Sequence, residues 1–209
     1  GEQRYGSLGN SATLGLMLLR GQFKEFCQEL LGNPQLIRDA NWQAAAIAYQ
    51  RGDLESALQL LPLRMQEERR LLRLLQAGGS CRKAVLALPR KLLRLYLSAC
   101  QSHLFDRLLE QRLPDLGQLR DGDIAYKHAN GACFLVQDSA SEQPRADCFE
   151  ISPTAPLYGF KVMQAEGATA AQEQLVLDEM GLSLDSWKLG GGLAMPGERR
   201  PLRVPLLQP

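Results

Sequence analysis

The sequence lacks the features that mark membrane-spanning and exported proteins. Its 209 residues contain no uncharged apolar run of the roughly eighteen residues that a transmembrane helix requires. The chain also has no basic segment followed by an apolar core, which is the pattern of a secretory signal peptide. We therefore expect a soluble, unexported protein of the cytoplasm.

Cysteine is scarce and follows no ligand or redox pattern. The five cysteines are an odd number and include no Cys-x-x-Cys pair. Cys27 and Cys100 fall within helical patterns, where a thiol acts as a small hydrophobic side chain. This usage is typical of a reducing compartment, in which disulfides are rare.

Histidine and phosphate-binding motifs are also nearly absent. His103 and His128 are the only histidines, and neither has a cysteine or carboxylate at ligand spacing. No nucleophile motif accompanies either, so we expect packing or surface roles for both. No Gly-x-x-x-x-Gly-Lys motif occurs, and the three glycines at 190–192 neither follow a predicted strand nor open a helix. These absences disfavour a zinc site, a serine hydrolase and a nucleotide-binding loop.

What the chain does contain is the composition of an ordinary globular protein. It is 45% hydrophobic and 22% charged, and its length suits one domain or one and a half. Apolar residues at helical spacing, with Gly and Pro between them, predict a series of helices in the first half. These helices are expected at residues 12–20, 22–31, 35–50, 53–61, 65–76 and 80–88.

Two local features add detail to this first half. Asn10 or Ser11 is expected to cap the first helix with its side chain. The pattern of a helix, Arg-Gly and a helix with an acidic start occurs at residues 20–21 and again at 51–52, an offset of thirty-one residues. Such an echo indicates stacked helical hairpins.

A long amphipathic helix near the middle of the chain is the central element. It is predicted over residues 94–112, with Pro89 at its start and Pro114 closing its end. Its buried stripe consists of residues at steps of three and four: Leu93, Tyr96, Leu97, Cys100, Leu104 and Leu108. Small residues near its centre would let another backbone approach closely.

After Pro114 the pattern changes to short strands. Residues 124–127 and 132–136 predict a hairpin whose Asn130-Gly131 supplies the turn. Further strands are expected at 148–151, at 159–164 and, as a short or edge strand, at 202–207. A helix is expected over 169–180, capped by Thr169. Helices first and strands later predict an α+β fold.

Positive charge is concentrated in one stretch of a nearly neutral chain. The basic band, residues 64–94, contains nine Lys or Arg against two Glu, a net charge of +7, and the rest of the chain carries −6. Arg69 and Arg73 lie one helical turn apart, as do Arg90 and Arg94, so each pair shares a helix face. Such a band is the electrostatic pattern expected for a polyanionic partner. The alternative is an ordinary solvated helix face.

Five segments, in chain order, resemble the TruD family of tRNA pseudouridine synthases. Residues of the central helix stand in the family's register: Ala99, Gln101, Ser102, Leu104, Phe105, Leu109 and Arg112. The other four segments are GEQRYG at 1–6, GDI at 122–124, ISPTAPLYG at 151–159 and RRPLRV at 199–204. One such match would be weak, but five ordered matches from the first residue to nearly the last are specific.

The resemblance implies that residues 1–209 are the inserted domain of such an enzyme, with a helical subregion at 1–114 and a β-hairpin or α+β subregion at 115–209. The catalytic domain would lie outside the chain on both sides. The family isomerises uridine in tRNA, expected at uridine 13, with one aspartate and without a metal or organic cofactor. That aspartate's motif is not found here, and its role is assigned to none of Asp106, Asp123 and Asp147. We therefore expect this stretch to be inactive by itself.

RNA binding and docking to the catalytic domain are the roles that remain. Arginine makes planar, bidentate phosphate contacts and stacks on bases. The residues expected to contact RNA are Arg4, Arg69, Arg73, Arg90, Arg94, Arg199, Arg200 and Arg203. The arginines near the two ends could instead brace the domain junction. Because both ends of an insertion return to one domain, residues 1–6 and 199–204 are expected to lie close together.

Two further functions remain open on the sequence alone. The helical-hairpin echo fits a non-catalytic protein-interaction module, and the basic band fits a stand-alone RNA-binding domain. A Gly-x-Lys-Asp-like motif upstream of this stretch would favour the synthase over both.

Overall fold

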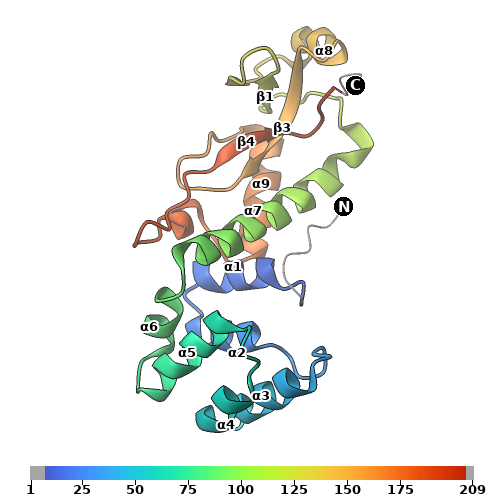
Figure 1. Ribbon diagram of the computed structural model, residues 1–209. Coiled ribbons are helices and arrows are strands. Elements are labelled where there is room, and N and C mark those ends of the chain that lie inside the picture. The colour runs from blue at the N-terminus through green and yellow to red at the C-terminus, as the bar shows by residue number, and fades with distance from the viewer. Residues whose placement is uncertain (1–7, 206–209) are drawn as a thin grey trace. The chain divides into compact units, whose positions relative to one another are not determined.

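The computed structural model describes residues 8–205, which form two compact units (Figure 1). The units divide inside the longest helix, α7 (Arg90–Arg112), between Cys100 and Gln101. The composition change near residue 114, where the sequence suggested a boundary between subregions, lies beyond the end of this helix. No helix among residues 8–205 combines the length and apolar character needed to cross a membrane.

The N-terminal unit is built from helices, and each predicted helix is present. They are α1 (Ser11–Leu19), α2 (Phe23–Leu31), α3 (Ala40–Gln50), α4 (Leu54–Leu60), α5 (Gln66–Gln76), α6 (Cys81–Leu86) and the first part of α7. The prediction that α3 begins at residue 35 is wrong. Asp39 caps this helix by accepting a hydrogen bond from the Trp42 amide at 3.0 Å, so the helix starts at Ala40.

Asn10 is the N-cap residue of α1, as predicted, but neither Asn10 nor Thr169 caps a helix with its side chain, because each side chain bonds to a residue distant in the sequence. Asn10 stands before α1, but its Nδ2 donates to the backbone oxygen of Glu29 at 3.0 Å and to its Oε1 at 2.7 Å. Thr169 lies inside α9 (Gly167–Glu179) and donates its hydroxyl to Asp123. Capping preference was therefore overridden by bonds to residues distant in the sequence.

The helix, Arg-Gly, helix pattern that repeats after thirty-one residues corresponds to two similar structural units. α1 packs against α2, and α3 against α4, so each pair forms a helical hairpin (Figure 1). At the two Arg-Gly turns, Gly21 has φ +67° and Gly52 has φ +81°, a conformation that side chains with a Cβ rarely adopt. The same glycine chemistry therefore closes both hairpins.

The expected close approach to the central helix occurs at Gly15 of α1. A Cβ on Gly15 would lie 2.1 Å from the Tyr96 carbonyl oxygen and 2.8 Å from the Cys100 Cβ. Phe26 of α2 completes this contact, with its ring edge against Tyr96 at 5.8 Å between centroids. Backbone contact of α1 with α7 is thus part of the N-terminal unit's core.

The C-terminal unit contains an antiparallel sheet with strand order β2-β1-β3-β4. Its strands are β1 (Ile124–Lys127), β2 (Cys133–Leu135), β3 (Ile151–Leu157) and β4 (Glu198–Pro201). The other elements are the rest of α7, α8 (Ser139–Asp147), α9 and the 3₁₀ turns η1 (Leu113–Asp115) and η2 (Leu184–Trp187). The predicted hairpin of β1 and β2 is present, with Gly131 at φ +76° in its turn. The α+β fold is confirmed.

The strands after the hairpin differ from prediction. β3 starts at Ile151 and runs through both Pro153 and Pro156. A strand tolerates proline where its nitrogen faces an unpaired side, and β3 pairs with β1 through its first three residues and with β4 through its last four. Residues 159–164 form no strand, and α8 was missed because it contains Pro144. The C-terminal strand is at 198–201; residues 202–205 of the strand predicted at 202–207 are not in it, and residues 206–207 lie outside the described residues.

Candidate functional site

Two arginines of the basic band have structural contacts. Arg64, in the turn before α5, lies 2.6 Å from Asp39 and lowers the pKa of that half-buried carboxyl. Arg69 of α5 donates through Nη1 to the carbonyl oxygens of Leu58 at 2.8 Å and Leu61 at 2.6 Å. Arg69 therefore holds the C-terminal end of α4 against α5, and the other N–H groups of its guanidinium make no bond to another described residue.

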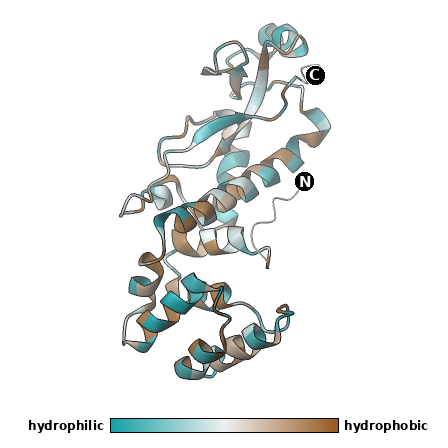
Figure 2. Cartoon of the chain, in the orientation of Figure 1, coloured by the Kyte–Doolittle hydropathy of each residue, from teal (hydrophilic) through white to brown (hydrophobic). Residues whose placement is uncertain are grey.

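The other seven cations of the band are exposed to solvent. Figure 2 shows that much of α5 is hydrophilic. Arg94 is exposed, and the side chains of six more exposed residues have no hydrogen-bond or ion-pair partner within residues 8–205: Arg70, Arg73, Arg82, Lys83, Arg90 and Lys91. An unneutralised group of this kind attracts anions and is screened by salt.

Arg199, on β4, is buried inside the C-terminal unit. Its Nη2 lies 2.7 Å from Glu173 Oε1, and its Nε donates to Thr154 Oγ1 at 3.0 Å. Desolvation raises the pKa of Glu173, and the bonds from Arg199 oppose that rise. All three guanidinium nitrogens are engaged, since Nη1 also donates to Glu173 and to Met163 O. These contacts favour a structural role for Arg199 over direct contact with RNA.

Arg200 and Arg203 stack on aromatic rings of the same unit. The guanidinium carbon of exposed Arg200 lies 5.6 Å from the Phe105 ring centroid. That of Arg203 lies 4.3 Å from the Phe149 centroid, and its Nη2 donates to the Ala146 carbonyl. Arg4, and with it the expected proximity of residues 1–6 to 199–204, lies outside the described residues.

The Gly-Asp pair at 122–123 is buried where α7, α9 and the turn before β1 meet. Arg112 holds both Asp123 oxygens, at 3.1 and 3.2 Å, and Thr169 donates to Oδ1 at 2.7 Å. Gly122 permits this packing, because a Cβ there would lie 2.3 Å from the Glu166 carbonyl oxygen. Asp123 thus connects α7, the turn before β1 and α9, and its oxygens are occupied by protein donors.

The histidines and thiols show no catalytic arrangement. His128 Nε2 lies 2.9 Å from Ser152 Oγ, but Ser152 is fully buried, and His103 is exposed on α7. Burial raises the pKa of the Cys100 thiol to about 12, which keeps it protonated. In the described part of the chain, no group of three or more His, Cys, Asp or Glu could hold a metal ion.

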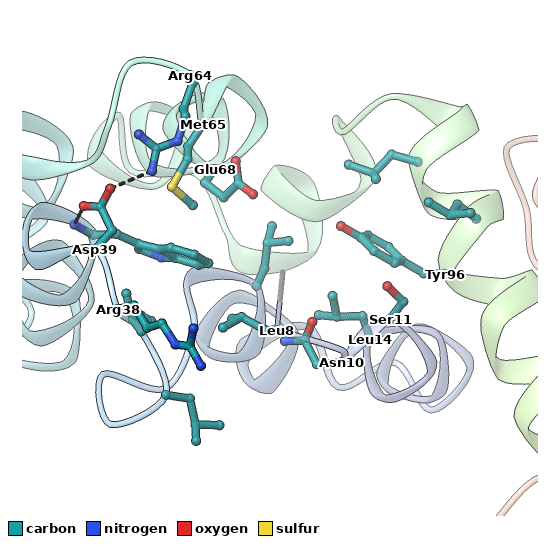
Figure 3. A pocket seen from close by; sticks show the side chains of 16 residues that line it. Leu8, Asn10, Ser11, Leu14, Arg38, Asp39, Arg64, Met65, Glu68 and Tyr96 are labelled. Atoms are coloured by element: carbon teal, nitrogen blue, oxygen red, sulfur yellow. Dashed lines mark hydrogen bonds and ion pairs between the residues drawn. The ribbon is translucent and has the colours of Figure 1, made fainter. Parts of the chain in front are cut away.

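The N-terminal unit also has an open groove of about 870 Å³ (Figure 3). Its lining is mainly apolar and includes the Trp42 and Tyr96 rings. Arg38 and the Arg64–Asp39 pair line it together with Glu68, whose pKa burial raises. Two cations and two acids cancel, so the groove does not have the charge that a polyanion would require.

A second pocket, of about 440 Å³, lies along α5 and the turn before it. It is lined by Leu63, Gln66, Glu67, Arg69, Arg70 and Arg73. Of these residues, only Arg69 and Arg73 were predicted from the sequence to be site residues; Glu67 and Arg70 were not. The spacing of residues 66, 69, 70 and 73 places them on one helix face and was the signal that could have identified the pocket.

Comparison with known proteins gives consistent matches over nearly the whole chain. The family model described as tRNA pseudouridine synthase D (TruD) matches residues 1–208. A protein of Syntrophotalea carbinolica named tRNA pseudouridine synthase D is 56% identical over 206 residues, which are 99% of this chain and 52% of that protein. Its namesake in Geobacter sulfurreducens is 48% identical over 210 residues, covering 100% of this chain and 52% of the relative.

A solved structure shares the fold. The crystal structure of a putative tRNA pseudouridine synthase D from Methanosarcina mazei matches with a TM-score of 0.86 at 23% identity. The match covers 97% of this chain and 50% of that one. The chain thus spans about half the length of the relatives that it matches.

Proposed function

The chain belongs to the tRNA pseudouridine synthase D (TruD) family, and on this premise we propose that it is part of an enzyme that isomerises a uridine of tRNA, expected to be uridine 13, to pseudouridine. The observation that carries the proposal is 56% identity to a named synthase over 99% of this chain. A match along nearly the whole length supports the synthase over both an interaction module and a stand-alone RNA-binding domain.

The catalytic group is proposed to lie outside these 209 residues. The reaction needs a carboxylate beside a uridine that has left its stacked position. Asp123 does not fit this role, because it is fully buried and its oxygens are taken by Arg112, Arg120 and Thr169. The partner of this stretch would be the catalytic domain of the same full-length chain.

The contribution of this stretch would be to hold tRNA. The six unpartnered cations on α5, α6 and the start of α7 supply charge for phosphate contacts without reading sequence. Arg199 is left out of the proposed contact surface, because Glu173 and Thr154 occupy its guanidinium. Arg200 stays in it as an exposed cation.

The test is pseudouridine formation in a tRNA transcript, measured by mass spectrometry after chemical labelling. The full-length protein should convert uridine 13, and the 209-residue stretch alone should convert none. Product from the stretch alone would place a catalytic group within it. Absence of product with the full-length protein, using a transcript that a known family member modifies, would overturn the proposed function.

A further inference from the structure

The groove of Figure 3 presents apolar side chains to solvent. Leu36 is 66% exposed and Leu95 is 42% exposed, and both line this groove of about 870 Å³. Exposed apolar side chains that gather in a concave surface commonly mark a binding site. The groove therefore offers apolar area to a ligand.

Two aromatic rings of the lining are held in place by the protein itself. Trp42 Nε1 donates to the Leu31 carbonyl oxygen at 2.6 Å, and Phe26 packs edge-on against Tyr96. The Trp42 side chain is only half-buried, so part of its surface remains open. Because the rings are already fixed, a ligand that packs on them loses little affinity to side-chain ordering.

Two polar groups of the same groove have no protein partner. Figure 3 shows the Glu68 carboxyl and the Tyr96 hydroxyl pointing into it, and neither makes a side-chain hydrogen bond or ion pair with another residue among 8–205. Neither group is among the polar atoms that are closed off from solvent without a partner, so a ligand in the groove can reach both.

The protonation of these two groups follows from their surroundings. Burial raises the pKa of Tyr96 to about 12, and the nearby Glu68 carboxylate adds to that rise, so the hydroxyl remains a hydrogen-bond donor at neutral pH. Burial also raises the pKa of Glu68, because its charge is only partly solvated. A ligand that donates hydrogen bonds to this carboxylate would offset the loss of water.

The charge of the groove favours the neutral part of a nucleic acid. Arg64 is paired with Asp39, so the lining does not suit a run of phosphates. An unstacked base is neutral and planar, with apolar faces and a hydrogen-bonding edge. Exposed Lys91 lies one helical turn before Leu95 on the same face of α7, where it could contact the phosphate next to such a base.

We propose that this groove holds one unstacked guanine of the bound tRNA, with a face of the base on Trp42 and with Glu68 and Tyr96 at its edge. The inference rests on the proposed function, since tRNA is the ligand. Guanine carries two neighbouring donors, N1–H and the 2-amino group, beside its O6 acceptor. The two Glu68 oxygens accept from these donors, and the Tyr96 hydroxyl donates to O6. Adenine, cytosine and uracil do not present this order of two donors and an acceptor.

The competing occupant is an apolar segment of protein. Such a segment would cover Leu36 and Leu95, but it would leave the Glu68 carboxylate in an apolar interface without a donor. That arrangement is unfavourable, because a desolvated charge needs a partner. The unpartnered carboxylate therefore favours the base.

The identity of the base is tested with oligouridylates of about ten nucleotides that carry guanosine, inosine or adenosine at one central position. Their affinity for the full-length protein is measured by fluorescence anisotropy. Guanosine should increase affinity about ten-fold over the all-uridine strand, and inosine, which lacks the 2-amino group, should lose most of that gain. Equal affinity for the guanosine and adenosine strands would overturn the assignment of guanine.

Glu68→Gln tests the carboxylate. Its amide has one acceptor oxygen in place of two, so the preference for guanosine over adenosine should fall about ten-fold. The matched control is Glu25→Gln on α2, which removes an exposed carboxylate elsewhere in the N-terminal unit and should keep the preference. Because both variants lose one negative charge, the ratio of affinities isolates the base contact. A preference that Glu68→Gln leaves unchanged would overturn the proposal.

Trp42→Leu tests the stacking surface. It should weaken the guanosine strand about five-fold or more, since stacking of a base on an aromatic ring contributes substantially to affinity. Circular dichroism and thermal unfolding establish that this variant is folded. Unchanged affinity in the folded variant would show that the base does not lie on Trp42.

Leu36→Ser/Leu95→Ser separates an RNA occupant from a protein occupant. Both leucines are exposed in the described structure, so thermal unfolding of the full-length protein should change little if the groove is open to RNA. A marked fall in the unfolding temperature would mean that another part of the protein covers the groove, and it would overturn the proposal.

Failure of this inference can be told from failure of the proposed function. If wild-type protein forms pseudouridine but Glu68→Gln keeps the preference for guanosine, the inference fails and the proposed function stands. If wild-type protein forms no pseudouridine in a transcript that a known family member modifies, the proposed function fails, whatever the oligonucleotides show.

Discussion

At the scale of single residues, the arginines of this chain fall into two kinds according to what neutralises them. Arg112 and Arg199 are buried against Asp123 and Glu173, and both pairs carry additional hydrogen bonds. A buried charge is tolerated only when it is paired in this way. Exposed arginines such as Arg70 need no protein partner, so their charge is available to a ligand.

Replacing Arg199 should therefore affect stability. Arg199→Met leaves the Glu173 carboxylate buried without its cation and is expected to lower the free energy of unfolding of the full-length protein by about 3–5 kcal/mol. The double variant Arg199→Met/Glu173→Met should recover much of the loss, because no unpaired charge remains. The free energy of unfolding is measured by urea-induced unfolding, with Arg200→Met, at an exposed arginine, as the control. An equal loss of stability in the control would contradict the conclusion that Arg199 stabilises the fold by neutralising Glu173.

Glu68 predicts a dependence of stability on pH. Burial raises its pKa in the folded protein, so ionisation destabilises the fold as the pH rises above about 4.3, the ordinary value for glutamate, and through the raised folded value. At about pH 7.5, Glu68→Gln should unfold at a higher temperature than wild type. The gain should shrink as the pH falls towards about 3, where both the folded and the unfolded wild type hold the proton.

The control for this effect is Glu25→Gln on α2, which is exposed and should show no pH-dependent gain. Thermal unfolding of all three full-length proteins across the pH range is the measurement. A Glu68→Gln gain that is constant with pH would indicate a packing effect, because titration would then not be its cause.

At the scale of elements, helix contact in the N-terminal unit depends on a missing side chain. Gly15 brings the backbone of α1 against the Tyr96 carbonyl of α7, and Phe26 of α2 packs on the same tyrosine. Close packing of this kind leaves no room for an added methyl group.

Gly15→Ala is accordingly expected to destabilise the protein by about 1–3 kcal/mol, despite the better helix propensity of alanine. The added Cβ would lie 2.1 Å from a backbone oxygen, which can yield only if the helices separate. Gly190→Ala is the matched control, since its Cβ would meet nothing within 4 Å. Thermal unfolding that ranks the two variants equally would refute this packing argument.

At the scale of the whole molecule, charge is divided unequally along the chain. The basic band carries +7 and the remainder −6, so the net charge of the chain does not reveal the local excess of positive charge that we propose contacts tRNA. The structure shows which of these charges are exposed, because Arg64 and Arg69 have protein partners while six others have none among residues 8–205.

A variant with Arg73, Arg82, Arg90 and Lys91 all changed to glutamine tests this distribution in the full-length protein. Its tRNA affinity should fall, and its salt slope should become shallower by up to roughly one unit per lost phosphate contact. Thermal unfolding should change little, because these side chains are exposed and unpartnered in the described structure. An unchanged salt slope would mean that the band faces away from the tRNA.

The sequence by itself determined the helices of the first half, the long central helix and the hairpin at Asn130-Gly131. Apolar spacing and turn chemistry are local, so each of these elements is specified by residues close together in the chain. The side-chain caps were predicted incorrectly, because Asn10 and Thr169 bond to residues distant in the sequence, which a local pattern does not identify.

Only the tertiary structure decided which arginines are bonded within the protein and which are exposed and able to bind a ligand. Arg199 and Arg200 are adjacent on β4, yet strand alternation sends one to Glu173 and the other to the surface. Arg69 and Arg70 differ likewise, since only Arg69 reaches the carbonyls of Leu58 and Leu61. An arginine's role depends on whether folding brings an acceptor to it, and those acceptors come from other elements of the chain.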